Sequence, residues 1–192
     1  MAQRLLVVAH APTSTTKASL FGDPGELVRW EEFRRLSGRI ASWVSGPEEV
    51  CQATALRLGG TAEAIHDLRE CDFGAWTGKA LADVASQDPS GLDTWLRDPH
   101  AAPHGGESLA VLINRVGRVL DEQQWPDGRS VAVVTPLVAR ALLVHALGAA
   151  PEVIFRIDIA PLGRALISRS QHMWRLTSLE PVKDSPQGDR LG

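Results

Sequence analysis

Two short, uninterrupted apolar runs constrain the fold of this chain more than any other feature. The runs are Leu5–Ala9 and Val131–Val134, and each leads directly into polar sequence, at His10 and at Thr135. Apolar runs of this length are typical of strands buried on both faces of a parallel sheet. In such sheets the ligand site lies beyond the carboxyl ends of the strands. The sequence therefore places His10 and Thr135 beside a candidate site.

Helical patterns alternate with the strand-like runs. The pattern predicts helices over residues 26–40, 48–58, 107–124 and 137–148, and short helices near 80–86 and 90–97. It also predicts strands near residues 42–45, 64–68, 157–160, 165–168 and 173–179. This alternation predicts an α/β fold, a three-layer α/β/α sandwich with a mostly parallel central sheet.

The length of 192 residues suits one domain. We expect that domain to span residues 1–180, with residues 69–106 as an irregular cap or insert. Residues 181–192 form a polar C-terminal tail, which we expect to be frayed.

Charge and composition exclude several classes of protein. Twenty Lys and Arg against 23 Asp and Glu give a net charge of −3, which does not suit a nucleic-acid or membrane-surface binder. Apolar runs are too short for a membrane span or a secretory signal, so a cytoplasmic protein is expected. Cys51 and Cys71 form neither a metal-ligand pair nor a disulfide framework. The oligomeric state stays open, and a dimer is one option.

Four segments resemble, in order, motifs of the histidine phosphatase superfamily, the phosphoglycerate-mutase-like proteins. Leu6–Thr13 resembles the Arg-His-Gly-x-Thr signature, and Leu68–Gly78 is similar to Leu-x-Glu-x-x-Phe-Gly-x-Trp-x-Gly. Gly105–Ser108 matches Gly-Gly-Glu-Ser, and Arg140–Leu143 resembles the start of the helix after the last catalytic strand. The resemblance implies the fold and a mechanism. A histidine carries the phosphoryl group, arginines and a second histidine hold it, and a glutamate protonates the leaving oxygen.

Within this resemblance, His10 stands at the nucleophile position and Glu70 at that of the acid. The arginine expected before the nucleophile is Ala9, and the second arginine is Val50. The second histidine is missing: it is either deleted between Thr135 and Pro136 or, in an alignment without a gap, replaced by Thr135. Glu48 and Glu49 precede the vacant second arginine position and make it less suitable for an anion. The sequence therefore predicts a degenerate phosphate pocket with weak or no phosphomonoesterase activity.

Six further residues are candidates for binding a substrate or ligand. Each has a structural alternative, such as solvation for the lysine, helix capping for the serine and second threonine, and ion pairing for the arginine. A metal site built from His10, Glu70, His100 and His104 is a weaker alternative, and we expect no metal and no cofactor. The six candidates are Thr13, Lys17, Trp76, Ser108, Thr135 and Arg140.

Three functions are compatible with these residues. The first is a degenerate family member that binds a small molecule, an anion being one option, in the old pocket. The second is an isomerase, lyase or hydrolase that uses His10 and Glu70 as an acid/base pair on a non-phosphate substrate. The third is a residual phosphomonoesterase that acts through phospho-His10, with Lys17 or Arg140 replacing the lost cations.

Overall fold

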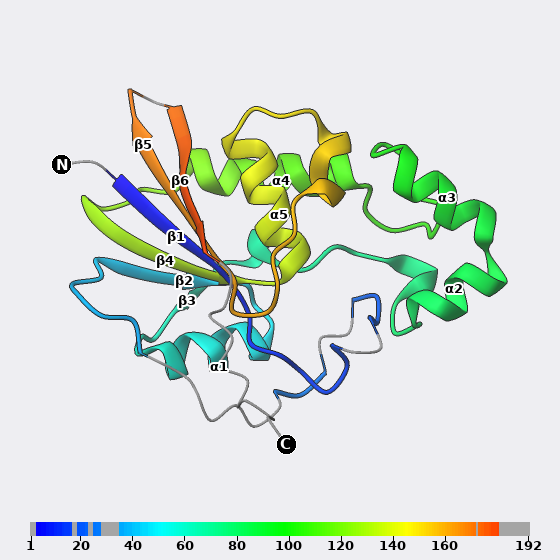
Figure 1. Ribbon diagram of the computed structural model, residues 1–192, viewed down its shortest axis with the longest axis horizontal. Helices are drawn as coiled ribbons and strands as arrows, with labels where there is room; N and C mark the ends of the chain where they lie inside the picture. The colour runs from blue at the N-terminus through cyan, green and yellow to red at the C-terminus, as the bar shows by residue number, and fades with distance from the viewer. Residues whose placement is uncertain (1–2, 17–18, 23–24, 28–34, 172, 181–192) are drawn as a thin grey trace, which may run out of the picture.

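One mixed sheet forms the centre of the protein (Figure 1). The computed structural model describes residues 3–16, 19–22, 25–27, 35–171 and 173–180. Along the sheet the strand order is β3-β2-β4-β1-β5-β6; the first three neighbouring pairs are parallel and the last two antiparallel. The bounds are β1 (Gln3–Ala9), β2 (Ser42–Ser45), β3 (Glu63–Ala64), β4 (Gly128–Val134), β5 (Arg164–Ser170) and β6 (Met173–Glu180).

The two apolar runs are the central strands, as predicted. β1 and β4 lie side by side in parallel, with Ala9 opposite Val134. Side chains along β1 alternate between two buried clusters. Leu5 and Val7 pack on one face, and Leu6 and Val8 on the other. A strand covered on both faces has no position that favours a polar residue, which explains the continuous apolar sequence.

Helices cover both faces of the sheet and complete the three layers. In Figure 1, α1 (Glu49–Leu58) lies on one face, and α4 (Leu109–Glu122) and α5 (Pro136–Ala146) lie on the other. Gly59 ends α1 in the left-handed conformation, at φ 109°, which a glycine adopts without strain. The predicted α/β/α sandwich with a mostly parallel sheet is confirmed.

The segment predicted to be an irregular cap projects past the ends of the strands. It holds α2 (Leu81–Gln87) and α3 (Pro89–Arg97), which Figure 1 shows beyond the edge of the sheet layers. Three short 3-10 helices complete the elements of the described chain: η1 (His66–Leu68), η2 (Gly74–Trp76) and η3 (Pro151–Arg156). None of the helices in the described part of the chain is long and apolar enough to cross a bilayer.

Three predicted elements differ from the structure. Residues 157–160 are not a strand; the segment leads instead into a turn in which Gly163 N donates to Ala160 O and Leu162 N donates to Ala9 O at the end of β1. The strand predicted at 64–68 shortens to β3, since Leu68 N bonds back to Ile65 O in a 3-10 turn.

The helix predicted over residues 26–40 is wrong for residues 35–40. Leu36 N donates to Leu58 O, at the end of α1, and Ala41 N donates to the carbonyl of Arg129, the second residue of β4. These bonds to other segments replace the local bonds of a helix. Residues 28–34 lie outside the described residues, as do the predicted tail residues 181–192.

Candidate functional site

His10 follows the last residue of β1 and is fixed by its backbone. Its N–H donates to Val134 O of β4 at 2.9 Å, and its carbonyl accepts from Leu162 N at 3.2 Å. The side chain is buried, and Nδ1 lies 2.7 Å from the carbonyl of Ala11. A carbonyl can only accept, so Nδ1 carries the proton in the neutral ring. Nε2 is therefore the nitrogen with a lone pair for chemistry or for a ligand.

The turn that carries His10 is also tied to α1. Ala11 N donates to Thr54 Oγ1 at 3.1 Å, and the Thr54 side chain is fully buried. Two elements, β4 and α1, thus set the position of the imidazole through its neighbouring backbone.

Glu70 lies on the segment that follows η1. Its Oε1 accepts from Cys71 N at 2.8 Å, and the Thr135 hydroxyl is close enough to favour the charged carboxylate. Thr135 is the N-cap residue of α5 but makes no side-chain capping bond, and only 1% of its surface is exposed. Its Oγ1 has no well-aligned hydrogen bond within the described residues. The structure therefore brings Glu70 and Thr135 together, at the positive end of the α5 dipole.

Glu48, which the sequence placed just before the vacant arginine position, makes a contact that was not predicted. It is the N-cap residue of α1, yet its side chain does not cap that helix. Instead Oε1 accepts from the backbone N–H of Glu70 at 2.6 Å. The other oxygen, Oε2, is buried without a well-aligned hydrogen bond among the described residues, and the Cys51 thiol lies close to this carboxylate. The Glu48 carboxylate thus joins the start of α1 to the Glu70 segment.

Burial and this carboxylate set the protonation of the site. Burial lowers the pKa of His10, while the bond to Ala11 and the charge of Glu48 act in the opposite direction. The pKa of Glu70 is raised to about 7, chiefly by burial and further by Glu48, against the Cys71 N–H, Thr135 and Arg115. His10 is therefore neutral near pH 7, and Glu70 exchanges a proton in that range.

The two cysteines are unreactive neighbours of the site. Burial raises the pKa of the Cys51 thiol, and the charges of Glu48 and Glu70 raise it further. The pKa of the Cys71 thiol is also raised, by burial and by the charges of Glu70 and Glu107. Both are free thiols. A protonated thiol is a poor nucleophile, so neither cysteine suits covalent chemistry here.

An internal ion pair holds the Glu70 segment in place. Arg115 of α4 bonds both oxygens of Glu107, at 2.8 and 2.6 Å, and both side chains are almost fully buried. The same guanidinium donates to the carbonyl of Asp67 at 2.7 Å, and more weakly to those of Arg69 and Glu70. Sequence analysis missed this clamp, although an arginine on the apolar face of the 107–124 helix was a signal for it.

The loop after His10 uses its own hydroxyls. Thr13 is buried, and its Oγ1 lies 3.2 Å from Thr15 Oγ1 and 3.0 Å from Thr16 Oγ1. These contacts hold the loop together and give no sign of a ligand role for Thr13. Lys17, which was predicted to reach an anion, lies outside the described residues.

Two further candidates have the structural role that was weighed as the alternative. Ser108 caps α4 by accepting from Val111 N at 3.3 Å. Arg140 on α5 reaches Asp158, with Nη2 3.4 Å from Oδ1, while its Nε is buried without a partner in the described chain. Neither contact links these side chains to His10.

Trp76 belongs to a buried aromatic cluster. The cluster includes Phe21, Phe73, Trp95 and His104, with the Trp76 ring 4.9 Å from that of His104. Trp76 is 3% exposed, and these ring contacts account for its burial; contact with a ligand stays a prediction.

The alternative metal site does not form in the described chain. His104 is buried in the aromatic cluster, and its Nδ1 accepts from Gly106 N at 3.1 Å. His100 is exposed. Across the described ranges, no group of three or more His, Cys, Asp and Glu side chains is arranged to hold a metal ion.

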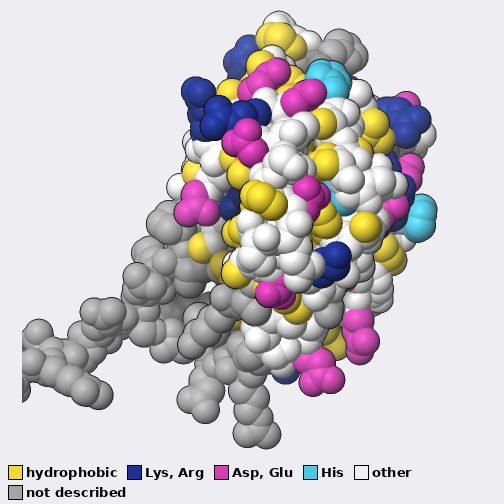
Figure 2. Space-filling model, turned by 90° about the vertical axis from the view of Figure 1, so that its right-hand side faces the viewer, with side chains coloured by type: hydrophobic (Ala, Val, Ile, Leu, Met, Phe, Trp, Pro, Cys, Tyr) yellow, Lys and Arg dark blue, Asp and Glu magenta, His cyan; other side chains and the backbone are white. Residues whose placement is uncertain are grey.

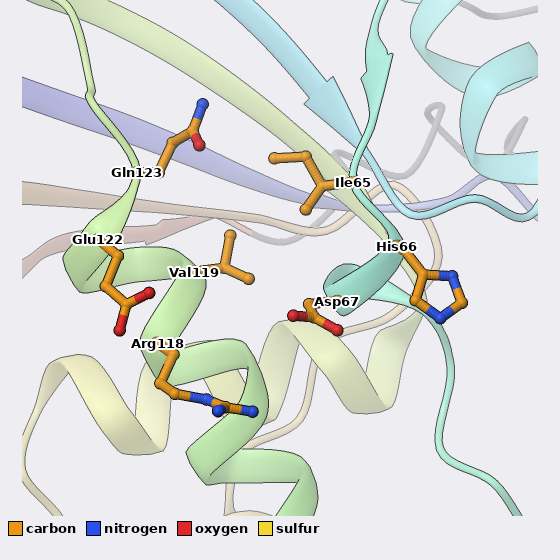
Figure 3. A pocket seen from close by; sticks show the side chains of 7 residues that line it. All are labelled: Ile65, His66, Asp67, Arg118, Val119, Glu122 and Gln123. Carbon is orange, nitrogen blue, oxygen red and sulfur yellow. The ribbon is translucent and has the colours of Figure 1, made fainter.

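A separate groove of about 410 Å³ lies between α4 and the start of η1 (Figure 3). Asp67, Arg118 and Glu122 give it charges of both signs, and Ile65 and Val119 lie between them. None of the predicted site residues lines this groove. The candidate site is therefore the constellation of His10, Glu48, Glu70 and Thr135, which we call the acidic site.

Similarity to known proteins agrees with this architecture. The family model of the histidine phosphatase superfamily (branch 1) matches residues 26–181. Bifunctional protein Rv2228c of Mycobacterium tuberculosis is 33% identical over 182 residues, 84% of this chain and 50% of that protein. Phosphoserine phosphatase 1 of Hydrogenobacter thermophilus is 36% identical over 113 residues, 54% of this chain and 53% of that protein. The chain thus spans about half the length of these relatives.

Solved structures show the same fold at low sequence identity. The alpha-ribazole phosphatase of Shigella flexneri matches with a TM-score of 0.75 and 19% identity, over 92% of this chain and 96% of that one. Mycobacterial glucosyl-3-phosphoglycerate phosphatase Rv2419c matches with a TM-score of 0.73 and 21% identity, over 94% of this chain and all of that one. The resemblance read from the sequence is confirmed, and the chain belongs to the histidine phosphatase superfamily.

Proposed function

We propose that this chain has weak or no phosphomonoesterase activity and binds a small-molecule ligand in the acidic site. One observation carries the proposal: the carboxylate of Glu48, which accepts from Glu70 N at 2.6 Å, lies close enough to His10 to raise the pKa of its imidazole. A phosphoryl group brings negative charge, and its transfer needs cations or N–H donors around it. A carboxylate in that place opposes both binding and transfer.

The rate cost of losing phosphate-binding cations supports a loss of ordinary phosphatase turnover. Removing one preorganised donor to a transition state costs about 100- to 1,000-fold in rate. In this chain Ala9 and Val50 stand where the family resemblance implies arginines, and Thr135 where it implies a histidine. Such losses are not additive, but together they leave little of the original catalysis.

The test is a phosphatase assay on the purified chain with p-nitrophenyl phosphate. We expect no turnover above that of a His10→Ala variant. Turnover at rates usual for phosphatases would instead support a residual phosphomonoesterase, provided that His10→Ala abolishes it and that a phosphorylated His10 is detected.

Acid/base chemistry on a non-phosphate substrate is the second candidate. It is supported by a neutral His10 with a free Nε2 and by a Glu70 whose pKa is about 7, a pair suited to moving protons near neutral pH. A screen of esters, lactones and isomerisable carbonyl compounds tests it. Activity that needs both His10 and Glu70 supports this candidate, whereas activity unchanged in His10→Ala and Glu70→Gln contradicts it.

A further inference from the structure

Two buried oxygens of the acidic site, Glu48 Oε2 and Thr135 Oγ1, have no well-aligned hydrogen bond within the described chain. The Cys51 thiol lies near the Glu48 carboxylate, and the Thr135 hydroxyl can donate to the Glu70 carboxylate, so both oxygens keep lone pairs that can accept. His10 Nδ1 is committed to the Ala11 carbonyl, so Nε2 presents a lone pair. Buried polar atoms without partners are rare, because each costs free energy unless a ligand or water satisfies it. These atoms therefore indicate the kind of ligand that fits.

Several N–H donors near the acidic site are already engaged by the protein itself. The backbone N–H groups of Glu70 and Cys71 donate to the carboxylates of Glu48 and Glu70. The positive end of α5 faces Glu70, and Pro136 removes one N–H from its first turn. The buried guanidinium of Arg115 is occupied by Glu107 and by backbone carbonyls.

We propose that the acidic site binds an organic cation that carries N–H donors, such as a protonated primary amine, with Glu48 as its counter-ion and Thr135 as a further acceptor. This inference rests on the proposed function, since it names the class of the small-molecule ligand. Thr135 is the independent support: it is almost fully buried, it lies against the Glu70 carboxyl, and its hydroxyl has no other well-formed partner in the described residues. A charged hydrogen bond in a buried site is stronger than one between neutral groups.

The experiment is an NMR titration of the His10 ring signals with n-butylammonium, its neutral isostere n-butanol, and inorganic phosphate. We expect butylammonium to bind at least about tenfold more tightly than butanol, as the loss of one charged hydrogen bond predicts. Phosphate should bind more weakly than butylammonium. Equal binding of the amine and the alcohol, or tighter binding of phosphate, would overturn the proposal.

Three variants assign the effect to the site. Glu48→Gln keeps an oxygen that can accept from Glu70 N but removes the charge, and should weaken butylammonium binding about tenfold. Glu49→Gln, an exposed neighbour on α1, is the matched control and should bind as the unmodified chain does. Thr135→Val removes a hydroxyl that no well-formed bond requires, so it should fold normally and weaken binding several-fold.

The outcomes separate this inference from the proposed function. His10-dependent turnover of p-nitrophenyl phosphate would refute the proposed function. An inert protein whose butylammonium affinity is the same in Glu48→Gln, Thr135→Val and Glu49→Gln would refute only the cation site.

Discussion

Glu48 Oε1 accepts a hydrogen bond from the backbone N–H of Glu70, 22 positions later in the sequence, with the two atoms 2.6 Å apart. This contact brings the start of α1 and the segment after η1 to one point beside His10. Two carboxyls and a neutral imidazole then share a buried environment. The electrostatics of the site follow from this arrangement and can be measured directly.

Replacing Glu48 by Gln should lower the pKa of both His10 and Glu70. The Glu48 charge raises the pKa of each group, because it stabilises the imidazolium and repels a second carboxylate. Titration of the His10 ring signals by NMR measures the first shift, and the carboxyl carbon of Glu70 the second. Glu49→Gln is the control and should move neither; an unchanged His10 pKa in Glu48→Gln would show that this charge does not reach the imidazole.

Glu70 should make the protein less stable as the pH rises from about 4.5 to 7. Its pKa is about 7 in the fold and 4.5 for an ordinary glutamate, so in this range the unfolded chain loses the proton first. The penalty is absent below pH 4.5 and reaches at most about 3 kcal/mol above pH 7. The free energy of unfolding, measured in urea, should therefore rise with pH in Glu70→Gln relative to the unmodified chain. A constant difference between the two proteins across this pH range would contradict the burial of a protonated Glu70.

Replacing Arg115 by Met should destabilise the fold by about 3–5 kcal/mol, because Glu107 would remain buried without its partner. Three backbone carbonyls near Glu70 would also lose a donor. Chemical denaturation measures the change. Arg97→Met breaks an exposed pair with Asp93 on α3 and is the control, expected to change little. Recovery of stability in Arg115→Met with Glu107→Leu would identify the unpaired charge as the cause.

Replacing Gly106 by Ala should cost more stability than the same change at Gly105. A Cβ on Gly106 would lie 2.1 Å from the backbone oxygen of Asp72. Because that atom belongs to the backbone, a side-chain rotation cannot relieve the clash. A Cβ on Gly105 meets nothing within 4 Å, and only its φ of 75° is unfavourable, at about 1–2 kcal/mol. Thermal unfolding of the two variants compares steric and conformational cost, and equal losses would argue against the close contact.

The described residues on one face of the molecule show mixed surface chemistry. The face shown in Figure 2 carries acidic, basic and hydrophobic side chains intermixed, without a broad patch of one charge. This agrees with the small net charge and adds no reason to expect nucleic acid as a partner.

Local sequence predicted the parts of this fold that local forces determine. β1, β4 and α1 follow from continuous apolar runs and from a helical segment ended by Gly59. Residues 157–160 could not be predicted in the same way, because their turn is set by bonds to the end of β1, which is distant in sequence.

The candidate site shows the same division. His10 and Glu70 were found from their places in motifs, whereas the role of Glu48 depends on a tertiary contact. Its place just before the vacant arginine position predicted a charge unfavourable to an anion, but not the hydrogen bond to the Glu70 segment. Thr135 was predicted either to touch a ligand or to cap α5; the structure excludes a side-chain cap within the described residues.

The Gly-Gly-Glu-Ser segment serves architecture throughout. Gly106 allows the chain to pass against Asp72, Glu107 neutralises Arg115, and Ser108 begins α4. A motif with these structural roles is expected wherever the fold is kept, whether or not the catalytic activity is kept. Similarity in this segment therefore indicates common ancestry, and catalytic activity has to be judged from the few atoms around His10.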